Sequence, residues 1–482
     1  MPKSPSLSVR LSPPTLVGER AAVGTAAAAA LIVLACCGAY AFFADRPLIP
    51  DIAWVIEACR RWLAGDRLYV DIVDVNPPLI FYETVALTAG RLSQHAYVAG
   101  VSIATALSCL WVLRLRGPYL AIAALTATLL GGYTDFGQRD HLALILVIPF
   151  LLGEKAPRNE RIALGLWAFF GVGLKPYLLL IPVGAIIARC VLTRTLQPLR
   201  SAEFLSLVGT CVLYLGAIAA IHPAYLTEIV PLAGFVYGAY GAPPKIEFAG
   251  LSLSIAVAAA IPILLRDGRR IPLAAATLGA LASFYLQGRN WSYHFDPAIG
   301  LGILLTLWSA RQYPGTAVLA FILAAGQLWR GPEREGTQSP IPQGAKSVAF
   351  LSAHVWAAYP TALDCGVRNE TRFAGLWPLP GAWNILNDRT RSLEDRRRAA
   401  RILSDERTVI RGDLLRNHTE IVFADARRVK PYFRYPFDYI QFLGGLPGYR
   451  YEGRISSYEI WALPGYRVGR PGCASRDRGE PD

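Results

Sequence analysis

Long apolar runs dominate the first two thirds of this 482-residue chain and continue to about Trp329. About 20 apolar residues suffice for a helix to cross a membrane. Charged residues make up 17% of the chain, against about 25% in soluble domains, which excludes a disordered chain and argues against an ordinary cytosolic enzyme. We therefore expect a polytopic α-helical membrane protein with eleven spans, near residues 21–43, 97–113, 117–134, 141–153, 162–174, 176–193, 205–222, 248–265, 271–286, 296–310 and 314–329.

The basic residues predict how the chain is oriented in the membrane. If the apolar stretch 78–92 is an interfacial helix on the outer side, the inner loops hold fifteen basic and five acidic residues, and the outer loops hold ten basic and twelve acidic ones. Counting 78–92 as a span would scramble this contrast. We predict a cytoplasmic N-terminal tail over 1–20, an uncleaved first span, and a membrane domain over 21–330 whose first outer loop, 44–96, carries interfacial helices.

Beyond residue 330 the sequence becomes typical of a soluble domain. Residues 347–351 and 420–423 are predicted to be short buried strands, 391–416 a charged helix, and 449–463 two further strands. These elements predict a small C-terminal α/β domain over 331–465 on the outer, periplasmic side. A disordered tail rich in Gly, Pro and Arg is expected over 466–482.

The net charge of +13 does not indicate a nucleic-acid-binding protein, because the basic residues lie in short loops between apolar runs. The eight cysteines show neither metal-ligand spacing nor a CxxC motif, so most are expected to be small apolar core residues. Cys59, Cys365 and Cys473 fall in segments expected to face an oxidising compartment, but the sequence pairs none of them.

The first outer loop carries the first candidate site residue. Asp51 opens an amphipathic stretch a few residues after the first span, and Tyr69 and the segment Asn76-Pro77-Pro78 follow it. A carboxylate at this position can act as a general base, and it can equally serve as the N-cap of a helix. Both interpretations of Asp51 stay open at this point.

A polar turn joins two later apolar runs at the same side of the membrane. It reads Thr134-Asp135-Phe136-Gly137-Gln138-Arg139-Asp140-His141. Ionisable residues at a membrane boundary are costly unless they have partners, so Arg139, Asp140 and His141 are candidate site residues. The alternative is a solvated turn capped by Asp135 and Asp140.

Two further stretches add cations and an imidazole at this boundary. Lys175 interrupts an otherwise uncharged pair of runs, where it could bind an anionic headgroup or merely extend to water. The loop around Arg289 and His294 also carries Trp291 and Tyr293, which alone would be an ordinary interfacial belt. Arg289 and His294 beside them favour contact with a phosphate or a sugar.

Four separate segments thus place carboxylates, cations and imidazoles on one outer face. This combination suits transfer from an anionic lipid, because a carboxylate can take a proton from an acceptor hydroxyl while cations stabilise the departing phosphate. The sequence contains no P-loop, no dinucleotide fingerprint and no zinc-type ligand spacing, so it gives no support for nucleotide chemistry.

These stretches resemble the GT-C superfamily of integral-membrane glycosyltransferases, and they are most similar to its bacterial branch near protein mannosyltransferases and lipid A aminoarabinose transferases. The resemblance rests on Asp51-Ile52-Ala53-Trp54 with Gly65-Asp66, Tyr69 and Asn76-Pro77-Pro78 after it, on Gln138-Arg139-Asp140-His141, on Lys175-Pro176, and on Trp291-Ser292-Tyr293-His294. Over the rest of the chain it extends to architecture alone. Unlike many members, this chain has Ile52 rather than a second acid after Asp51.

The resemblance implies a sugar donor carried on polyprenyl phosphate. It assigns Asp51 as the catalytic base, Asp140 as a second active-site acid, and Lys175 as a contact of the lipid phosphate. It also implies a divalent metal ion as a candidate cofactor, held by Asp51 and Asp140. The residues expected to complete the donor and substrate site are Arg139, Arg289, His294, Tyr69 and His141.

The leading hypothesis is therefore a glycosyltransferase of the bacterial inner membrane that transfers a sugar to a lipid, glycan or protein acceptor on the periplasmic face. A flippase or transporter is the first alternative. It would need polar residues that line a path near the bilayer midplane, where the expected spans carry almost none. A non-catalytic protein that acts in envelope assembly through its external domain is the second alternative.

Overall fold

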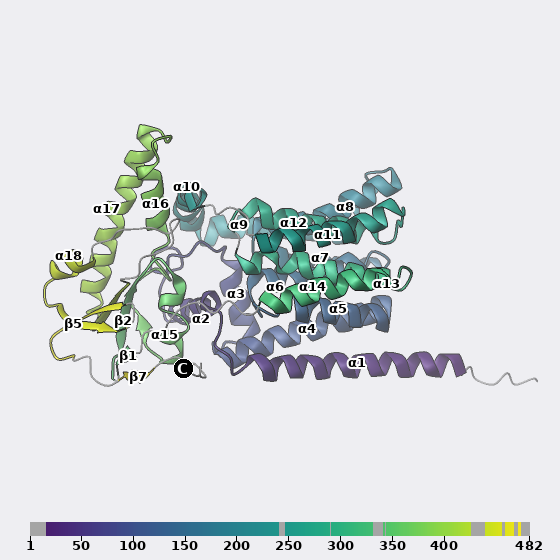
Figure 1. Ribbon diagram of the computed structural model, residues 1–482, viewed down its shortest axis with the longest axis horizontal. Helices are drawn as coiled ribbons and strands as arrows, with labels where there is room; N and C mark the ends of the chain where they lie inside the picture. Colours follow the sequence, from purple (N-terminus) through teal and green to yellow (C-terminus); the bar gives the residue numbers. More distant parts are fainter. Residues whose placement is uncertain are drawn as a thin grey trace, which may run out of the picture.

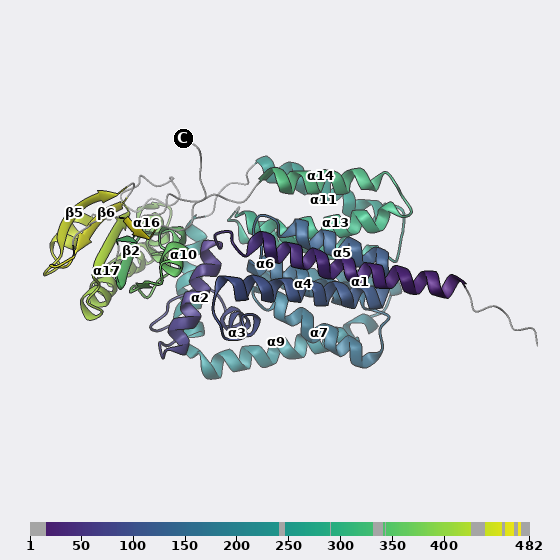
Figure 2. The ribbon, with the colours of Figure 1, turned by 90° about the horizontal axis from the view of Figure 1, so that it is seen from below.

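The chain folds into a helical bundle with a smaller α/β domain at one end (Figure 1). The computed structural model describes residues 16–240, 246–289, 291–330, 341–342, 344–425, 439–455, 458–466 and 471–473. The bundle helices run side by side along the long axis of the molecule in both views (Figure 2). We call the end of the bundle next to the α/β domain the domain-facing end, and the opposite end the far end.

Each apolar run expected to span the membrane forms a helix of this bundle. These helices are α1 (Leu16–Phe43), α4 (Gln94–Arg116), α5 (Pro118–Gly131), α6 (Arg139–Leu152), α7 (Arg158–Val172), α8 (Leu180–Thr193) with the preceding 3-10 turn η1 (Pro176–Leu179), α9 (Ala202–Ile221), α11 (Ile246–Leu264), α12 (Ile271–Gln287), α13 (Asp296–Ala310) and α14 (Thr316–Arg330). Local sequence marks the boundaries. Gly117 ends α4 at φ +81°, which favours glycine, and Pro118 begins α5, where its missing N–H is not needed.

Length and apolarity decide which helices could cross a bilayer alone. Four of the described helices meet both conditions, namely Ala22–Phe43, Gln94–Arg116, Pro176–Thr193 and Ala202–Ile221. Others are shorter: the 14 residues of α6 extend about 21 Å, less than the roughly 30 Å of a hydrocarbon core. The apolar helices suggest a membrane protein, and the count of eleven spans stays a prediction.

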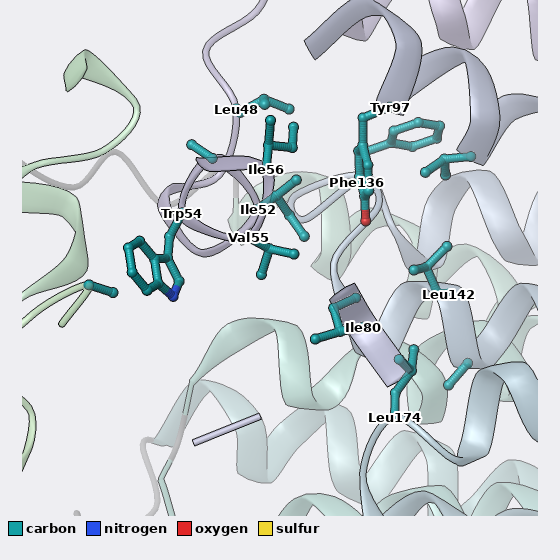
Figure 3. Packing of buried hydrophobic residues seen from close by; sticks show 14 of the residues in the cluster. Leu48, Ile52, Trp54, Val55, Ile56, Ile80, Tyr97, Phe136, Leu142 and Leu174 are labelled. Atoms are coloured by element: carbon teal, nitrogen blue, oxygen red, sulfur yellow. The ribbon is translucent and has the colours of Figure 1, made fainter. Parts of the chain in front are cut away.

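Two short helices of the segment 44–96, α2 (Pro50–Leu63) and α3 (Leu79–Leu87), lie near the domain-facing end (Figure 1). In α2, Ile52 lies on the face of the helix that is turned toward Phe136 of the bundle. Trp54 points to the opposite side (Figure 3). The ring centroid of Trp54 is 5.6 Å from that of Tyr359 in the α/β domain. α2 therefore packs between the two parts of the molecule.

The α/β domain contains a five-stranded sheet in the order β3-β2-β4-β6-β5. Its strands are β2 (Ser347–Leu351), β3 (Arg368–Asn369), β4 (Ile421–Asp425), β5 (Arg450–Ile455) and β6 (Tyr458–Ala462), and its helices are α15 (Thr361–Asp364), α16 (Pro378–Asn387), α17 (Leu393–Arg416) and α18 (Tyr439–Gly444). β2 pairs in parallel with β3 and β4, while β6 pairs antiparallel with β4 and β5. The predicted strands and the long charged helix are confirmed.

The predicted tails differ from the structure. Residues 16–20 begin α1, while 1–15 lie outside the described residues. At the other end, Pro471–Cys473 forms β7, which pairs antiparallel with β1 (Ile341–Pro342), and Cys473 forms a disulfide with Cys365. β7 and this disulfide therefore involve residues beyond the boundary predicted at 465. The two cysteines are 108 residues apart, so no local motif could have paired them.

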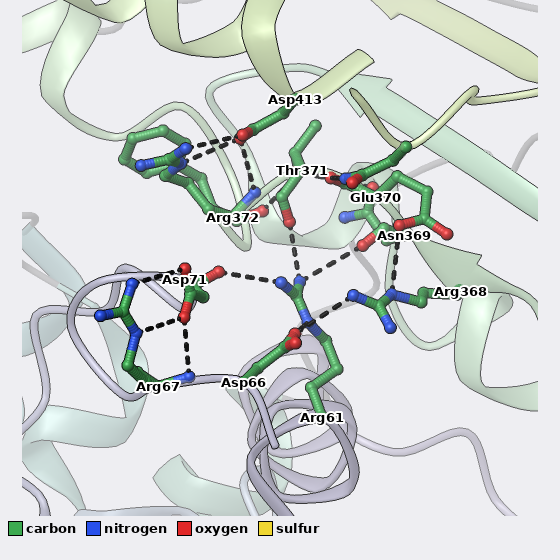
Figure 4. Close-up of polar contacts among 12 residues, drawn as sticks. Arg61, Asp66, Arg67, Asp71, Arg368, Asn369, Glu370, Thr371, Arg372 and Asp413 are labelled. Atoms are coloured by element: carbon green, nitrogen blue, oxygen red, sulfur yellow. Dashed lines mark hydrogen bonds and ion pairs between the residues drawn. The ribbon is translucent and has the colours of Figure 1, made fainter. Parts of the chain in front are cut away.

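Arg61 of α2 connects the segment 44–96 to the α/β domain (Figure 4). Its buried side chain donates from Nε to Asp66 at 2.8 Å, from Nη1 to the carbonyl oxygen of Thr371 at 2.8 Å, and from Nη2 to the carbonyl oxygen of Asp71 at 2.9 Å. A charged donor that satisfies several acceptors holds their relative positions more firmly than neutral hydrogen bonds would. Arg61 thus fixes how the α/β domain sits on α2.

Replacing Arg61 by alanine should destabilise the protein by about 3–5 kcal/mol, because buried acceptors lose their charged donor. Arg67→Ala is the matched control. Arg67 pairs with Asp71 on the surface, where the two side chains are 70% and 35% exposed, and such a pair contributes about 1 kcal/mol or less. Thermal unfolding of the purified full chain measures both variants. Equal midpoints for the two would contradict the role given to Arg61.

Candidate functional site

Residues from the predicted stretches meet at the domain-facing end of the bundle. Asp51 lies in the first turn of α2, Arg139 and Asp140 begin α6, Lys175 immediately precedes η1, and His294 lies in the 3-10 turn η5 (Ser292–Phe295). Hydrogen bonds, ion pairs and short-range electrostatic interactions connect these five residues. We call them the polar cluster.

Asp51 faces the bundle rather than capping its own helix. The N-cap of α2 is Ile49, so the alternative interpretation of Asp51 as an N-cap is wrong. The Oδ2 atom of Asp51 accepts hydrogen bonds from Nη2 of Arg139 at 2.9 Å and from Nε2 of Gln138 at 3.0 Å. Its Oδ1 atom accepts none from the described residues, and the side chain is 28% exposed. One carboxylate oxygen is therefore anchored, while the other bonds to no described residue.

The turn before α6 is buried, not solvated. Its cap is Gln138, whose side-chain oxygen accepts from the backbone N–H of Arg139 at 3.0 Å. Asp135 and Asp140 are both buried, so the alternative of a solvated turn capped by these two residues is wrong. The side-chain amide of Gln138 also donates to Asp51, so this one residue caps the start of α6 and orients the carboxylate.

Asp140 and Lys175 form a buried ion pair. Nζ of Lys175 donates to Oδ2 of Asp140 at 2.5 Å, and it lies 4.8 Å from the ring centroid of Tyr293. Burial lowers the pKa of Lys175 to about 8, while the negative charge of Asp140 opposes this shift. Because the ammonium is buried and paired, the alternative that Lys175 merely extends to water is wrong.

His294 is buried beside these cations. Burial lowers the pKa of its imidazole well below the usual range, and the positive charges of Lys175, Arg139 and Arg289 lower it further, which favours the neutral ring. Its Nδ1 atom is buried and forms no hydrogen bond with any described residue. Arg289 itself lies 4.8 Å from the ring centroid of Tyr237 and donates to the backbone oxygen of Tyr237. A neutral imidazole in this position can accept or donate one hydrogen bond.

Two predicted site residues have other contacts. The ring of His141 accepts at Nδ1 from the backbone N–H of Gly137 at 2.9 Å, which leaves Nε2 to donate to the carbonyl oxygen of Thr128 at 3.0 Å. Tyr69 is buried, and its hydroxyl donates to the carbonyl oxygen of Asn76 at 2.7 Å. The described hydrogen bonds of both side chains go to backbone groups rather than to the polar cluster.

Asp74, Gln138 and Tyr293 belong to the site although they were not predicted from the sequence. Asp74 is buried and accepts from Nε1 of Trp54 at 2.5 Å and from the backbone N–H of Asn76 at 2.6 Å. Burial raises its pKa, and the nearby charge of Arg139 lowers it. The Asp-x-Asn spacing before two prolines is typical of such a side-chain-to-backbone turn and was the available signal.

A divalent metal ion held by Asp51 and Asp140 does not fit this arrangement. Each carboxylate already accepts from a cation, Arg139 or Lys175, whose charge would repel a metal ion at the same oxygen. Across the described ranges, no group of three or more His, Cys, Asp or Glu side chains is placed to hold a metal ion. No reaction step at this site is assigned to a metal ion.

The polar cluster combines fixed cations with one accessible carboxylate oxygen beneath an α/β domain. Such a site can hold an anionic group and accept a proton beside it. No protein-family model, curated protein or solved structure matches this chain. The functional assignment therefore rests on the geometry of this site.

The buried ion pair allows a test of the cluster itself. Lys175→Met should destabilise the protein by about 3–5 kcal/mol, because Asp140 would keep a buried charge without its counter-ion. The double variant Asp140→Asn/Lys175→Met removes both charges and should recover most of that loss. Thermal unfolding of the purified full chain compares the two. A double variant no more stable than Lys175→Met would contradict the pairing.

Proposed function

We propose that this protein is a membrane glycosyltransferase that transfers a sugar from a polyprenyl-phosphate donor to an acceptor hydroxyl at the domain-facing end. The observation that carries the proposal is the polar cluster, in which the partly exposed Asp51 carboxylate lies near two cations from different segments, Arg139 of α6 and Lys175 before η1. A phosphate and a hydroxyl are the two groups that such a site would bring together. The acceptor is a lipid, a glycan or a protein.

Lys175 and Arg139 would hold the donor phosphate. An ammonium has three N–H groups, and the contact with Asp140 uses one of them. Arg139 donates from Nη2 to Asp51 and from Nε to Gln138, which leaves Nη1 for a further acceptor. Both cations are anchored by carboxylates, so they need little reorganisation when negative charge develops on the leaving phosphate.

Asp51 would act as the general base. The acceptor oxygen forms a bond to the anomeric carbon while the bond from that carbon to the phosphate oxygen breaks. The hydroxyl proton passes to Oδ1 of Asp51, and polyprenyl phosphate leaves with the bonding electron pair. His294, neutral and with Nδ1 unpartnered among the described residues, would orient the donor or the acceptor.

Two observations support placement of the polar cluster on the outer, periplasmic side. Disulfides form and persist in oxidising compartments, and the α/β domain contains the Cys365–Cys473 bond. The loops at the far end carry the excess of basic residues that is typical of the cytoplasmic side. Both favour an inner-membrane protein whose α/β domain covers the site from outside.

Asp51→Asn should reduce transfer by 10²–10⁴-fold, the usual contribution of a general base, without unfolding the protein. The measurement is release of polyprenyl phosphate from polyprenyl-phosphate hexose and pentose donors, with an envelope extract as the acceptor source. Mass spectrometry of lipid that copurifies with the protein identifies which donor to use. Donor binding should survive the substitution, because Lys175 and Arg139 remain.

Asp71→Asn is the control for this experiment, because Asp71 is another carboxylate of the same loop and its ion pair is on the surface. It should release polyprenyl phosphate at the wild-type rate. Unchanged turnover in Asp51→Asn would reject Asp51 as the base. A wild-type protein that neither copurifies with polyprenyl phosphate nor releases it would reject the transferase and favour a non-catalytic role.

The orientation predicts a labelling pattern in intact cells. A cysteine in place of the exposed Arg67, in the first outer loop, should react with a membrane-impermeant maleimide added outside the inner membrane. A cysteine in place of Arg158, at the far end, should react only after the membrane is opened. The labelling of each variant is compared with that of the unsubstituted protein, because the native free cysteines can also react. The reverse pattern would overturn the proposed orientation.

A further inference from the structure

A cavity lies at the far end of the bundle, on the other side from the polar cluster. Its volume is about 820 Å³, and it lies among the start of α7, the end of α8, the 3-10 turn η2 (Gln197–Arg200) and the start of α9. The opposite end of α9 leads to His222, whose Nε2 lies 2.9 Å from the hydroxyl of Tyr82 in α3. The 20 residues of α9 extend about 30 Å, so the start of α9 at the cavity and its end at His222 are separated by about the thickness of a hydrocarbon core.

Positive charge exceeds negative charge in this cavity. The charged residues that line it are Arg158, Arg161, Arg189, Arg200, Glu154 and Glu203. Glu203 pairs with Arg189 at 3.2 Å and with Arg161 at 3.4 Å, and Glu154 lies 3.3 Å from Arg189. Arg158 and Arg200 form no ion pair with any described residue and are exposed at the rim. Their charges are available to an anion.

Several polar atoms of the cavity wall are buried without a hydrogen-bond partner. In the described part of the chain, this holds for Nε of Arg161, Nε of Arg189 and Oγ of Ser201. Arg189 is 8% exposed, and its Nε lies within 3.3 Å of Glu154 without forming a hydrogen bond. Buried donors without acceptors are costly, and the N-terminus of α9 adds further N–H groups at the same place. An anion with several oxygens would satisfy these donors.

The cavity also has an apolar extension. It continues along α9 past Leu205 and Leu213, which are 55% and 75% exposed. α9 is one of the four described helices that are long and apolar enough to cross a membrane, so these leucines would face acyl chains. A free phosphate would use the cationic part alone, whereas a phospholipid would use both parts.

We propose that this cavity binds an anionic phospholipid of the cytoplasmic leaflet, with the phosphate between Arg158, Arg161 and Arg200 and an acyl chain along α9. Basic pockets between membrane helices on the cytoplasmic side recognise such headgroups. The site is separate from the polar cluster and does not depend on the transferase reaction.

The test compares lipid binding by the full chain in detergent. Purified protein is titrated with phosphatidylglycerol, with phosphatidylcholine and with inorganic phosphate, and binding is followed by native mass spectrometry and thermal stability. Arg158→Gln/Arg200→Gln removes two charges that pair with no described residue, so folding should be unaffected. Its affinity for phosphatidylglycerol should fall roughly thirtyfold, the loss expected for two cations beside an anionic headgroup.

Arg266→Gln/Arg269→Gln is the matched control. Both arginines are exposed in the loop between α11 and α12, at the same end of the bundle, and neither lines the cavity. This variant loses the same charge and should bind phosphatidylglycerol like the wild type. Equal binding by the wild type and the cavity variant would overturn the proposal. So would equal affinity for phosphatidylcholine, or equal stabilisation by inorganic phosphate, which would indicate a site for a free anion.

Discussion

The cost of holding an ionised group away from water shapes the domain-facing end of this protein. A charge buried among apolar helices persists when a counter-charge and hydrogen bonds compensate its lost hydration. Oδ2 of Asp140 meets this condition through Lys175, although its Oδ1 is buried without a hydrogen-bond partner among the described residues, and the anchored oxygen of Asp51 meets it through Arg139. These pairs connect α2, α6 and η1, so the same contacts that satisfy the charges also define the site. The same ion pairs thus hold this end of the bundle together and place the charged groups of the candidate site.

Helix α2 transmits the position of the α/β domain to this site. Its first turn carries Asp51, its middle carries Trp54 against Tyr359, and its last turn carries Arg61, which reaches the carbonyl oxygen of Thr371. A helix is stiff over 14 residues, so a shift of the domain would move the carboxylate as well. The α/β domain therefore has a positioning role in addition to covering the site.

The sequence predicts the helices and strands better than it predicts which side chains contact one another. Apolar runs and buried strands such as 347–351 are recognisable because burial imposes a local pattern. Topology also predicts that Asp51, Asp140 and Lys175 share one face, but pairing depends on distances between distant segments. The placement of His141 depends on Gly132, where a Cβ atom would lie 2.3 Å from the imidazole. The Cys365–Cys473 disulfide likewise depends on a contact between distant segments, the antiparallel pairing of β1 with β7.

The two carboxylates of the polar cluster differ in a way that separates their roles. Asp140 is fully buried, and protonating it would leave the ammonium of Lys175 without its counter-ion. Asp51 is partly exposed, and its second oxygen can take a proton while the first stays bonded to Arg139 and Gln138. A base must both reach its substrate and change charge without disrupting its surroundings. Asp51 satisfies both requirements, and Asp140 is better suited to hold Lys175 in place for an anionic ligand.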